Sequence, residues 1–189
     1  MPKVIFTYSS IYNRILSQIP KYSEIPDSKL TARYIAKFEK AWRPFESKIF
    51  VAIAKTTGFK WHEKEIPCYV TGGYGAFSDP LTVSMRKDTE HCIDTLTHEL
   101  IHRNISHDEI SKINSKKWRA HMKRYSKENR VVAVHVYIHA VHQKVILDLF
   151  GQGRFEKERN KMRHNTDYNR AWEIVEEVGY QKIIDSLKS

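Results

Sequence analysis

One short stretch in the middle of the chain, THELIH at residues 97–102, restricts the fold more than any other. On an α-helix, residues four apart lie on the same face, so His98 and His102 would present two imidazole rings in one direction. The two residues between Glu99 and His102 are apolar, and CIDTL at residues 92–96 extends this apolar side. The stretch therefore predicts a helix from about Thr89 to Asn104 that is buried on one side and open on the other.

Glu99 stands next to the first histidine of this stretch. Zinc accepts neutral histidine nitrogens at about 2.0–2.1 Å, so His98 and His102 are candidate zinc ligands. Glu99 lies about 100° around the helix from His98, where it can reach a water on the metal rather than the metal itself. Two ligands and a general base would thus come from a single turn. A chance occurrence is rare, about 0.04 per chain of this length and composition; the alternative is a plain histidine pair on a solvated helix face.

Length and composition limit the class of protein. A chain of 189 residues can bury about 70% of its unfolded surface, so we expect one domain without disulfides. Cys68 and Cys92 belong to no CxxC pair, which argues against a cysteine-based zinc site. Residues 1–27 lack the apolar core of a secretory signal, and no stretch approaches the roughly 18 apolar residues of a membrane span. The expected location is the cytoplasm.

The first third of the chain predicts a strand followed by helices. Residues 3–8 favour a short strand, and SSIYNRILSQI favours a helix capped by Ser9 or Ser10. A longer helix is expected to start near Asp27 or Ser28 and to end near Gly58, because its apolar residues repeat every three or four positions. Pro44 should kink or divide it.

The pattern changes at Ile66. The β-branched, aromatic and glycine residues that follow predict a hairpin with arms near Cys68–Phe77 and Leu81–Met85. After the motif helix we expect helices at about 108–125 and 129–150.

The stretch YNRAWEIVEEVGYQKIIDSL, residues 168–187, predicts one more helix, with Gly179 as a possible break in it. The fold class is therefore α+β and mostly helical. We expect a single domain over residues 1–189, with helices in 1–65, the sheet and motif helix in 66–105, and a helical part in 106–189.

The sequence HELIH after a glycine-containing hairpin resembles the zincin metallopeptidases, most closely their gluzincin-like or SprT-like small members. WRAHMKRYSKEN at residues 118–129 resembles the segment after the third ligand in SprT-like proteases. The preceding SKINSKK lacks the histidine of that family, and no glutamate motif of the gluzincins follows. The resemblance implies a small mixed sheet whose edge strand pairs with the substrate backbone, here the hairpin at 68–85. It also implies a Zn²⁺ cofactor, a peptide or protein substrate, and Glu99 as general base and acid.

A catalytic zinc site needs a third protein ligand. His107 follows His102 by five residues, one fewer than the metzincin pattern requires, and His121 lies among cations that suit a solvated helix face. The predicted helix 129–150 instead carries three histidines on one stripe of an otherwise apolar helix: His135, His139 and His142.

Buried imidazoles need polar partners, and a zinc ion facing this stripe would supply one. We favour His135 and His139, one as ligand and the other as its hydrogen-bonding support. Tyr137, on the same helix, could stabilise an oxyanion, but a core aromatic is the simpler interpretation.

The net charge of +10 raises a second hypothesis. Two basic stretches, residues 116–130 and 154–164, interleave cations with aromatic residues and could follow a phosphate backbone, although solvated helix faces also explain them. The first hypothesis is a zinc metallopeptidase with at most weak nucleic-acid binding. The alternative is a basic nucleic-acid-binding helical protein, or a DNA-associated SprT-like protease, in which the histidine motif is structural or degenerate.

Overall fold

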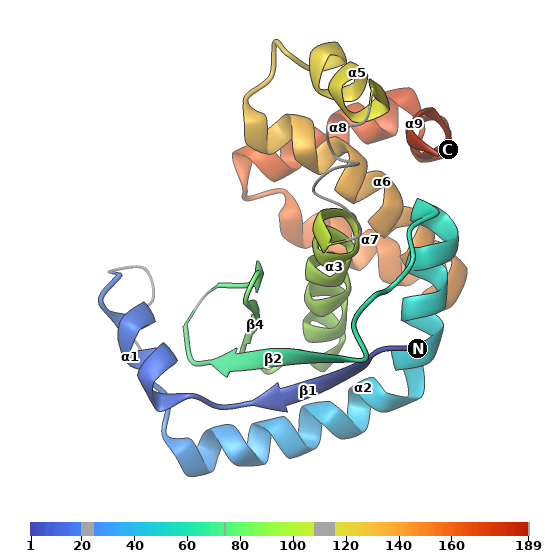
Figure 1. Ribbon diagram of the computed structural model, residues 1–189. Helices are drawn as coiled ribbons and strands as arrows, with labels where there is room; N and C mark the ends of the chain where they lie inside the picture. Colours follow the sequence, from blue (N-terminus) through green and yellow to red (C-terminus); the bar gives the residue numbers. More distant parts are fainter. Residues whose placement is uncertain (20–24, 74, 108–115, 189) are drawn as a thin grey trace. The chain divides into compact units, whose positions relative to one another are not determined.

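The computed structural model describes residues 1–19, 25–73, 75–107 and 116–188 (Figure 1). Among these residues, eight helices accompany one mixed four-stranded sheet, which confirms the α+β class. The contacts group into two compact units, and the prediction of a single domain stays a prediction. Unit 1 is Met1–Phe50 with Glu63–Arg103, and unit 2 is Val51–His62 with Asn104–Ser189.

The sheet of unit 1 has the order β1-β2-β4-β3. Strand β2 pairs in parallel with both β1 and β4, and only β3 is antiparallel, at one edge. The predicted hairpin between 68–77 and 81–85 is therefore wrong, because the chain reverses twice after β2 and only the short β3 pairs antiparallel with β4. The strands are β1 (Lys3–Thr7), β2 (Glu65–Thr71), β3 (Phe77–Ser78) and β4 (Leu81–Ser84).

Two helices connect β1 to β2, as a parallel pair of strands requires. Helix α1 (Ser10–Ser17) begins where the Ser9 side chain accepts a hydrogen bond from the backbone N–H of Tyr12, as predicted. Helix α2 (Ser28–Thr57) begins where Asp27 accepts from the N–H of Leu30.

Helix α2 continues through Pro44, so the predicted division of this helix is wrong. Tertiary packing explains the continuity, because Trp42 and Ile49 are fully buried on either side of the proline. The Arg43 guanidinium also binds the Glu46 carboxylate at 2.7 Å and donates to the backbone oxygen of Val4. These contacts hold the middle of α2 against β1.

Helix α3 (Thr89–His107) carries the histidine motif and buries Leu96 and Leu100 completely. Arg103 attaches it to the rest of unit 1. The Arg103 guanidinium donates to both carboxylate oxygens of Glu63, at 2.9 and 2.7 Å, and to the backbone oxygen of Ser78 at 2.8 Å. The helix that carries the motif is thus tied directly to the edge strand β3.

Unit 2 is built around α6 (Arg130–Phe150), which packs against each of its other helices. It begins at Asn129, whose side chain accepts from the N–H of Val132, and ends at Gly151 in a positive-φ conformation. The predicted break at Gly179 is confirmed, with φ of 90°. The other helices are α5 (Lys116–Arg124), α7 (Gln152–Met162), α8 (Thr166–Val178) and α9 (Tyr180–Leu187).

The first half of the helix predicted at 108–125 lies outside the described residues. In the part of the chain that is described, no helix has the length and apolar character needed to cross a membrane.

Candidate metal centre

Helix α3 presents His98 and His102 side by side on one face. Their ring centroids lie 4.9 Å apart with the planes at 65°. His98 is buried and His102 is half-buried, whereas Leu100 between them is fully buried against the core. The spacing of the motif and its apolar side therefore produce the predicted arrangement, with two imidazoles on the face opposite the core contacts.

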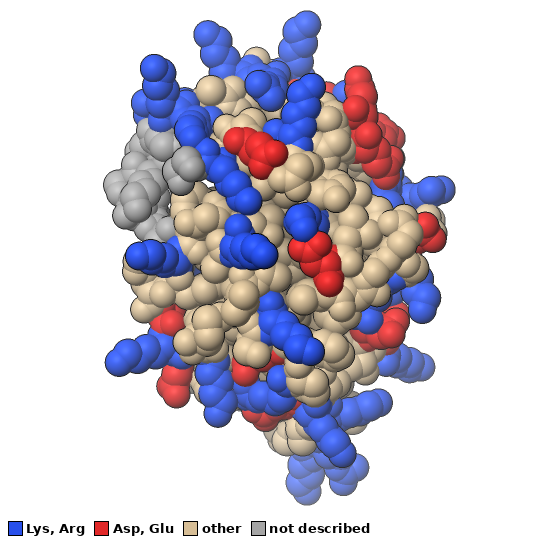
Figure 2. Space-filling view, turned by 90° about the vertical axis from the view of Figure 1, so that its right-hand side faces the viewer, with Lys and Arg blue, Asp and Glu red and all other residues tan. Residues whose placement is uncertain are grey.

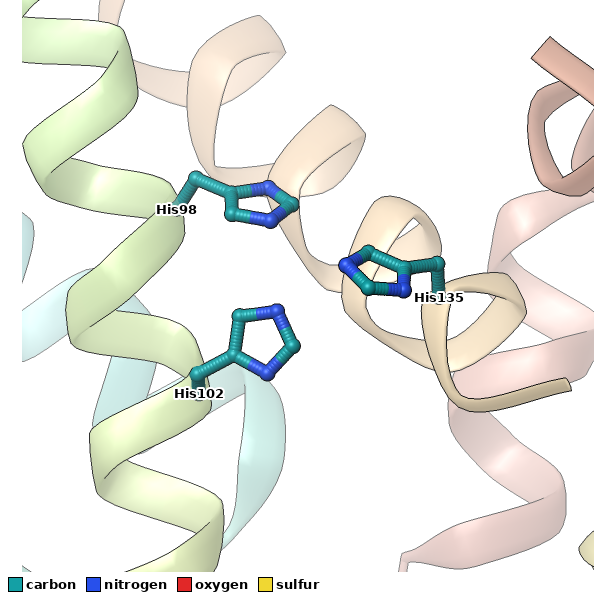
Figure 3. Close-up of side chains that lie close together, drawn as sticks. All are labelled: His98, His102 and His135. Atoms are coloured by element: carbon teal, nitrogen blue, oxygen red, sulfur yellow. The ribbon is translucent and has the colours of Figure 1, made fainter. Parts of the chain in front are cut away.

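His135 on α6 completes a group of three histidines. Each offers one ring nitrogen, and these three nitrogens all lie within 4.8 Å of one another. Figure 3 shows the rings facing a common point, with the ring nitrogen of His135 that is more distant from its Cβ directed toward His98 and His102. The sequence placed the third histidine on this helix but did not choose between His135 and His139.

The chemistry of this donor set fits a zinc ion. Three neutral imidazoles and a remaining position for water or substrate are a ligand set of catalytic zinc sites. In a tetrahedral site the ligand nitrogens lie about 3.3 Å apart, as follows from the zinc–nitrogen distance. Because the three nitrogens are already within 4.8 Å, small ring rotations would close the remaining gap.

A backbone hydrogen bond orients the His135 ring. Its Nδ1 lies 2.7 Å from the backbone oxygen of Val131, one turn earlier on α6. A carbonyl oxygen only accepts, so the proton is assigned to Nδ1 and the lone pair to Nε2, the nitrogen that faces the group. Burial lowers the pKa of His135, against the opposing effects of the Val131 carbonyl and Asp167, which favours the neutral ring that metals bind.

Glu99 lies in a desolvated environment. Its side chain is buried, and burial raises the pKa of its carboxyl group to about 8. The thiol of Cys68 on β2 lies close enough for the two groups to interact, and burial followed by the Glu99 charge raises the pKa of that thiol. A cation near Glu99 would favour its ionised form and lower its pKa.

The other histidines of α6 lie outside the group of three. His139 is buried and its ring stacks on Trp172, with centroids 4.4 Å apart and planes at 12°. His142 is buried one turn further along the helix. The structure brings together three of the four predicted ligands, His98, His102 and His135; that any of them, or His139, binds zinc stays a prediction.

The two remaining alternatives for the third ligand also lie outside the group. His121 is buried on α5, and its Nε2 lies 2.9 Å from the backbone oxygen of Ala133. It is a core residue rather than part of the solvated helix face that the sequence suggested. His107 is the last residue of α3, and its side chain lies outside the described residues.

Tyr137 is a core aromatic, the simpler of its two interpretations. It is buried, and its ring centroid lies 6.3 Å from that of Trp118 and 6.2 Å from that of His121. These contacts place it on the side of α6 that packs against α5.

Tyr168 on α8 was not identified from the sequence. Its ring centroid lies 4.3 Å from that of His135. One signal could have revealed it: Tyr168 and Trp172 are four residues apart, the same spacing as His135 and His139, so two helices packed side by side could pair these rings.

The chain was compared with family models, curated proteins and solved structures. No family model, no curated protein and no solved structure matches the chain.

Proposed function

We propose that this protein is a zinc-dependent peptidase in which His98, His102 and His135 hold the metal and Glu99 is the general base. The observation that supports this most directly is the convergence of the three histidine nitrogens within 4.8 Å, next to a buried carboxyl group on the same helical turn. A solvated pair of histidines would need neither the third ring nor the buried glutamate.

Zinc and Glu99 have different tasks in this proposal. Zinc, when bound, acts as a Lewis acid that polarises the scissile carbonyl and acidifies the attacking water. The Glu99 carboxylate takes the proton from that water and passes it to the departing amine. Burial raises the pKa of Glu99, and a zinc ion beside it would lower that pKa again and so favour the carboxylate that accepts the proton.

The sheet edge supports a peptide as the substrate. An extended peptide can add to an exposed strand through backbone hydrogen bonds, and β3 is an edge strand of this sheet. Arg103 lies four residues after Glu99 on α3. Its guanidinium holds β3 to this helix by donating to the backbone oxygen of Ser78. A peptide paired with β3 would therefore be fixed relative to the general base.

Two measurements test the proposal together. Freshly purified protein should contain about one zinc per chain, and it should cleave a mixed library of fluorescence-quenched peptides. Glu99→Gln should keep the zinc but lose at least about 100-fold in turnover, because an amide cannot accept the proton from water. Glu90→Gln, at an exposed position in the first turn of the same helix, should change neither.

The outcomes are distinct. Protein that contains no zinc and binds none when it is added would exclude the metal centre. If the zinc-loaded Glu99→Gln variant cleaves peptides as well as the wild type does, the metal stays in place and Glu99 is excluded as the base.

A second candidate function rests on the charge around α5. Residues 116–130 contain seven Lys and Arg residues and a single acidic residue, Glu128, which pairs with Arg170 at 2.7 Å. Lys116, Lys123 and Lys127 are all exposed. Figure 2 shows one face of the molecule, on which blue basic side chains outnumber red acidic ones. The density of cations in residues 116–130 favours binding to the phosphate backbone of a nucleic acid.

A pair of charge-reversed proteins tests this candidate. Lys116→Glu, Lys123→Glu and Lys127→Glu together should weaken binding to a labelled single strand of about 20 nucleotides by at least about tenfold at low salt and flatten its salt dependence. The control reverses Lys29, Lys37 and Lys40, three exposed cations of α2, and changes the net charge equally. Equal losses in both proteins would show that only the overall charge matters.

A further inference from the structure

We infer that Tyr168 is a positioning residue that holds His135 in the orientation needed for metal binding. This inference rests on the proposed zinc centre. Tyr168 belongs to α8, and its ring lies 4.3 Å from the His135 ring with the planes at 31°.

Four rings form a continuous layer between α6 and α8. His135 and His139 come from α6, with centroids 5.4 Å apart. Tyr168 covers His135, and Trp172 stacks on His139 at 4.4 Å. Because both pairs are separated by one helical turn, the two helices match ring to ring along their contact.

The tyrosine supplies a restraint that the backbone hydrogen bond does not. The bond from Nδ1 of His135 to the oxygen of Val131 fixes one ring atom, at 2.7 Å. A single hydrogen bond resists rotation about the Cβ–Cγ bond but still lets the ring rock about it by some degrees. A flat aromatic side chain against one face removes this freedom, so the ring is ordered before the metal arrives and loses less entropy on binding.

The backbone of Tyr168 is itself fixed relative to α6. The side chain of Asn165 accepts a hydrogen bond from the N–H of Tyr168 at 3.1 Å, which caps α8. The neighbouring Asp167 accepts from Nδ2 of Asn129 at 2.8 Å. Asn129 in turn caps α6 through the N–H of Val132. The first turn of α8 is therefore anchored to the start of the helix that carries His135.

Zinc affinity is the quantity that separates positioning from simple packing. We would measure it by competition with a chromophoric chelator, and record the visible spectrum of the cobalt-substituted protein. Tyr168→Leu should weaken zinc binding about 10–100-fold, the range typical of residues that orient a ligand. Tyr168→Phe, which keeps the flat ring, should stay within about twofold of the wild type and keep its cobalt spectrum.

Val175→Ala is the matched control. Val175 is buried on the same helix and is not one of the four rings, so its truncation should lower the melting temperature of the zinc-free protein. Its zinc affinity should equal that of the wild type. If Tyr168→Leu does not fold, Tyr168→Met, which fills the space without a flat ring, replaces it with the same expectation.

The results distinguish a failure of the proposed zinc centre from a failure of the proposed role of Tyr168. A wild-type protein that binds no zinc overturns the proposed centre and this inference with it. Zinc bound equally well by the wild type and the leucine or methionine variant overturns the inference alone. An equal loss of affinity in Val175→Ala would also overturn it, because general loosening of α8 would then be the cause.

Discussion

His121 illustrates how burial changes the behaviour of a single residue. Its ring is buried on α5, where desolvation lowers its pKa, against the opposing effect of the hydrogen bond to Ala133. Because the folded protein holds this proton less tightly than the unfolded chain, the stabilisation is fully present above about pH 6.5. It is lost as the pH falls below that value toward the lower pKa of the folded state.

We therefore expect the stability advantage of His121 to depend on pH. In zinc-free protein at about pH 7.5, His121→Gln should lower the free energy of unfolding by about 1–3 kcal/mol, the cost of breaking a buried hydrogen bond. The difference from the wild type should shrink as the pH falls from about 6.5 to about 5, measured by urea denaturation. His164→Gln, at an exposed turn, serves as the control, and a difference that stayed constant with pH would contradict the prediction.

The residues of the motif were predictable because their relation is local. His98, Glu99 and His102 lie within one helical turn, so the sequence spacing alone fixes which of them share a face. The choice between His135 and His139 depends on how α6 is rotated against its neighbours. That rotation is set by contacts such as the stacking of His139 on Trp172, which join residues far apart in the chain.

At the level of elements, the helix boundaries agree better with the sequence than the sheet does. Caps such as Ser9 and Asn129 and the positive-φ Gly151 mark helix ends through local chemistry. The parallel pairing of β2 with β4 has no such local mark, since any two apolar segments can pair in either direction. This is why the predicted hairpin was wrong.

Helix α2 offers a test of what Pro44 costs. A proline inside a helix removes one backbone hydrogen bond and crowds the preceding turn. Pro44 is exposed, so Pro44→Ala leaves no cavity and should raise the free energy of unfolding by about 1–3 kcal/mol. Ala36→Gly, at another exposed position of α2, should lower it by about 1 kcal/mol and so confirm that the helix limits stability. A loss of stability in Pro44→Ala would contradict the prediction and show that Pro44 stabilises the folded protein.

For the whole molecule, the proposed metal should act as a stabilising ligand. Its ligands come from α3 and α6, so the unfolded chain would hold zinc far more weakly than the folded one. Free zinc at about 100 times its dissociation constant should add about 2.7 kcal/mol to the free energy of unfolding. His102→Ala should abolish this increment in calorimetric melts with and without chelator, whereas His164→Ala should keep it.

The side chain of Asn129 belongs to two helices at once, since it caps α6 and donates to Asp167 in the first turn of α8. Helix ends normally fray independently, yet here one amide connects two of them across 38 residues of chain. The amide protons in these two first turns should therefore exchange with solvent deuterium at matched rates, as one opening event. In Asn129→Ala both turns should exchange faster together, while the protons near Ile146 at the far end of α6 keep their protection.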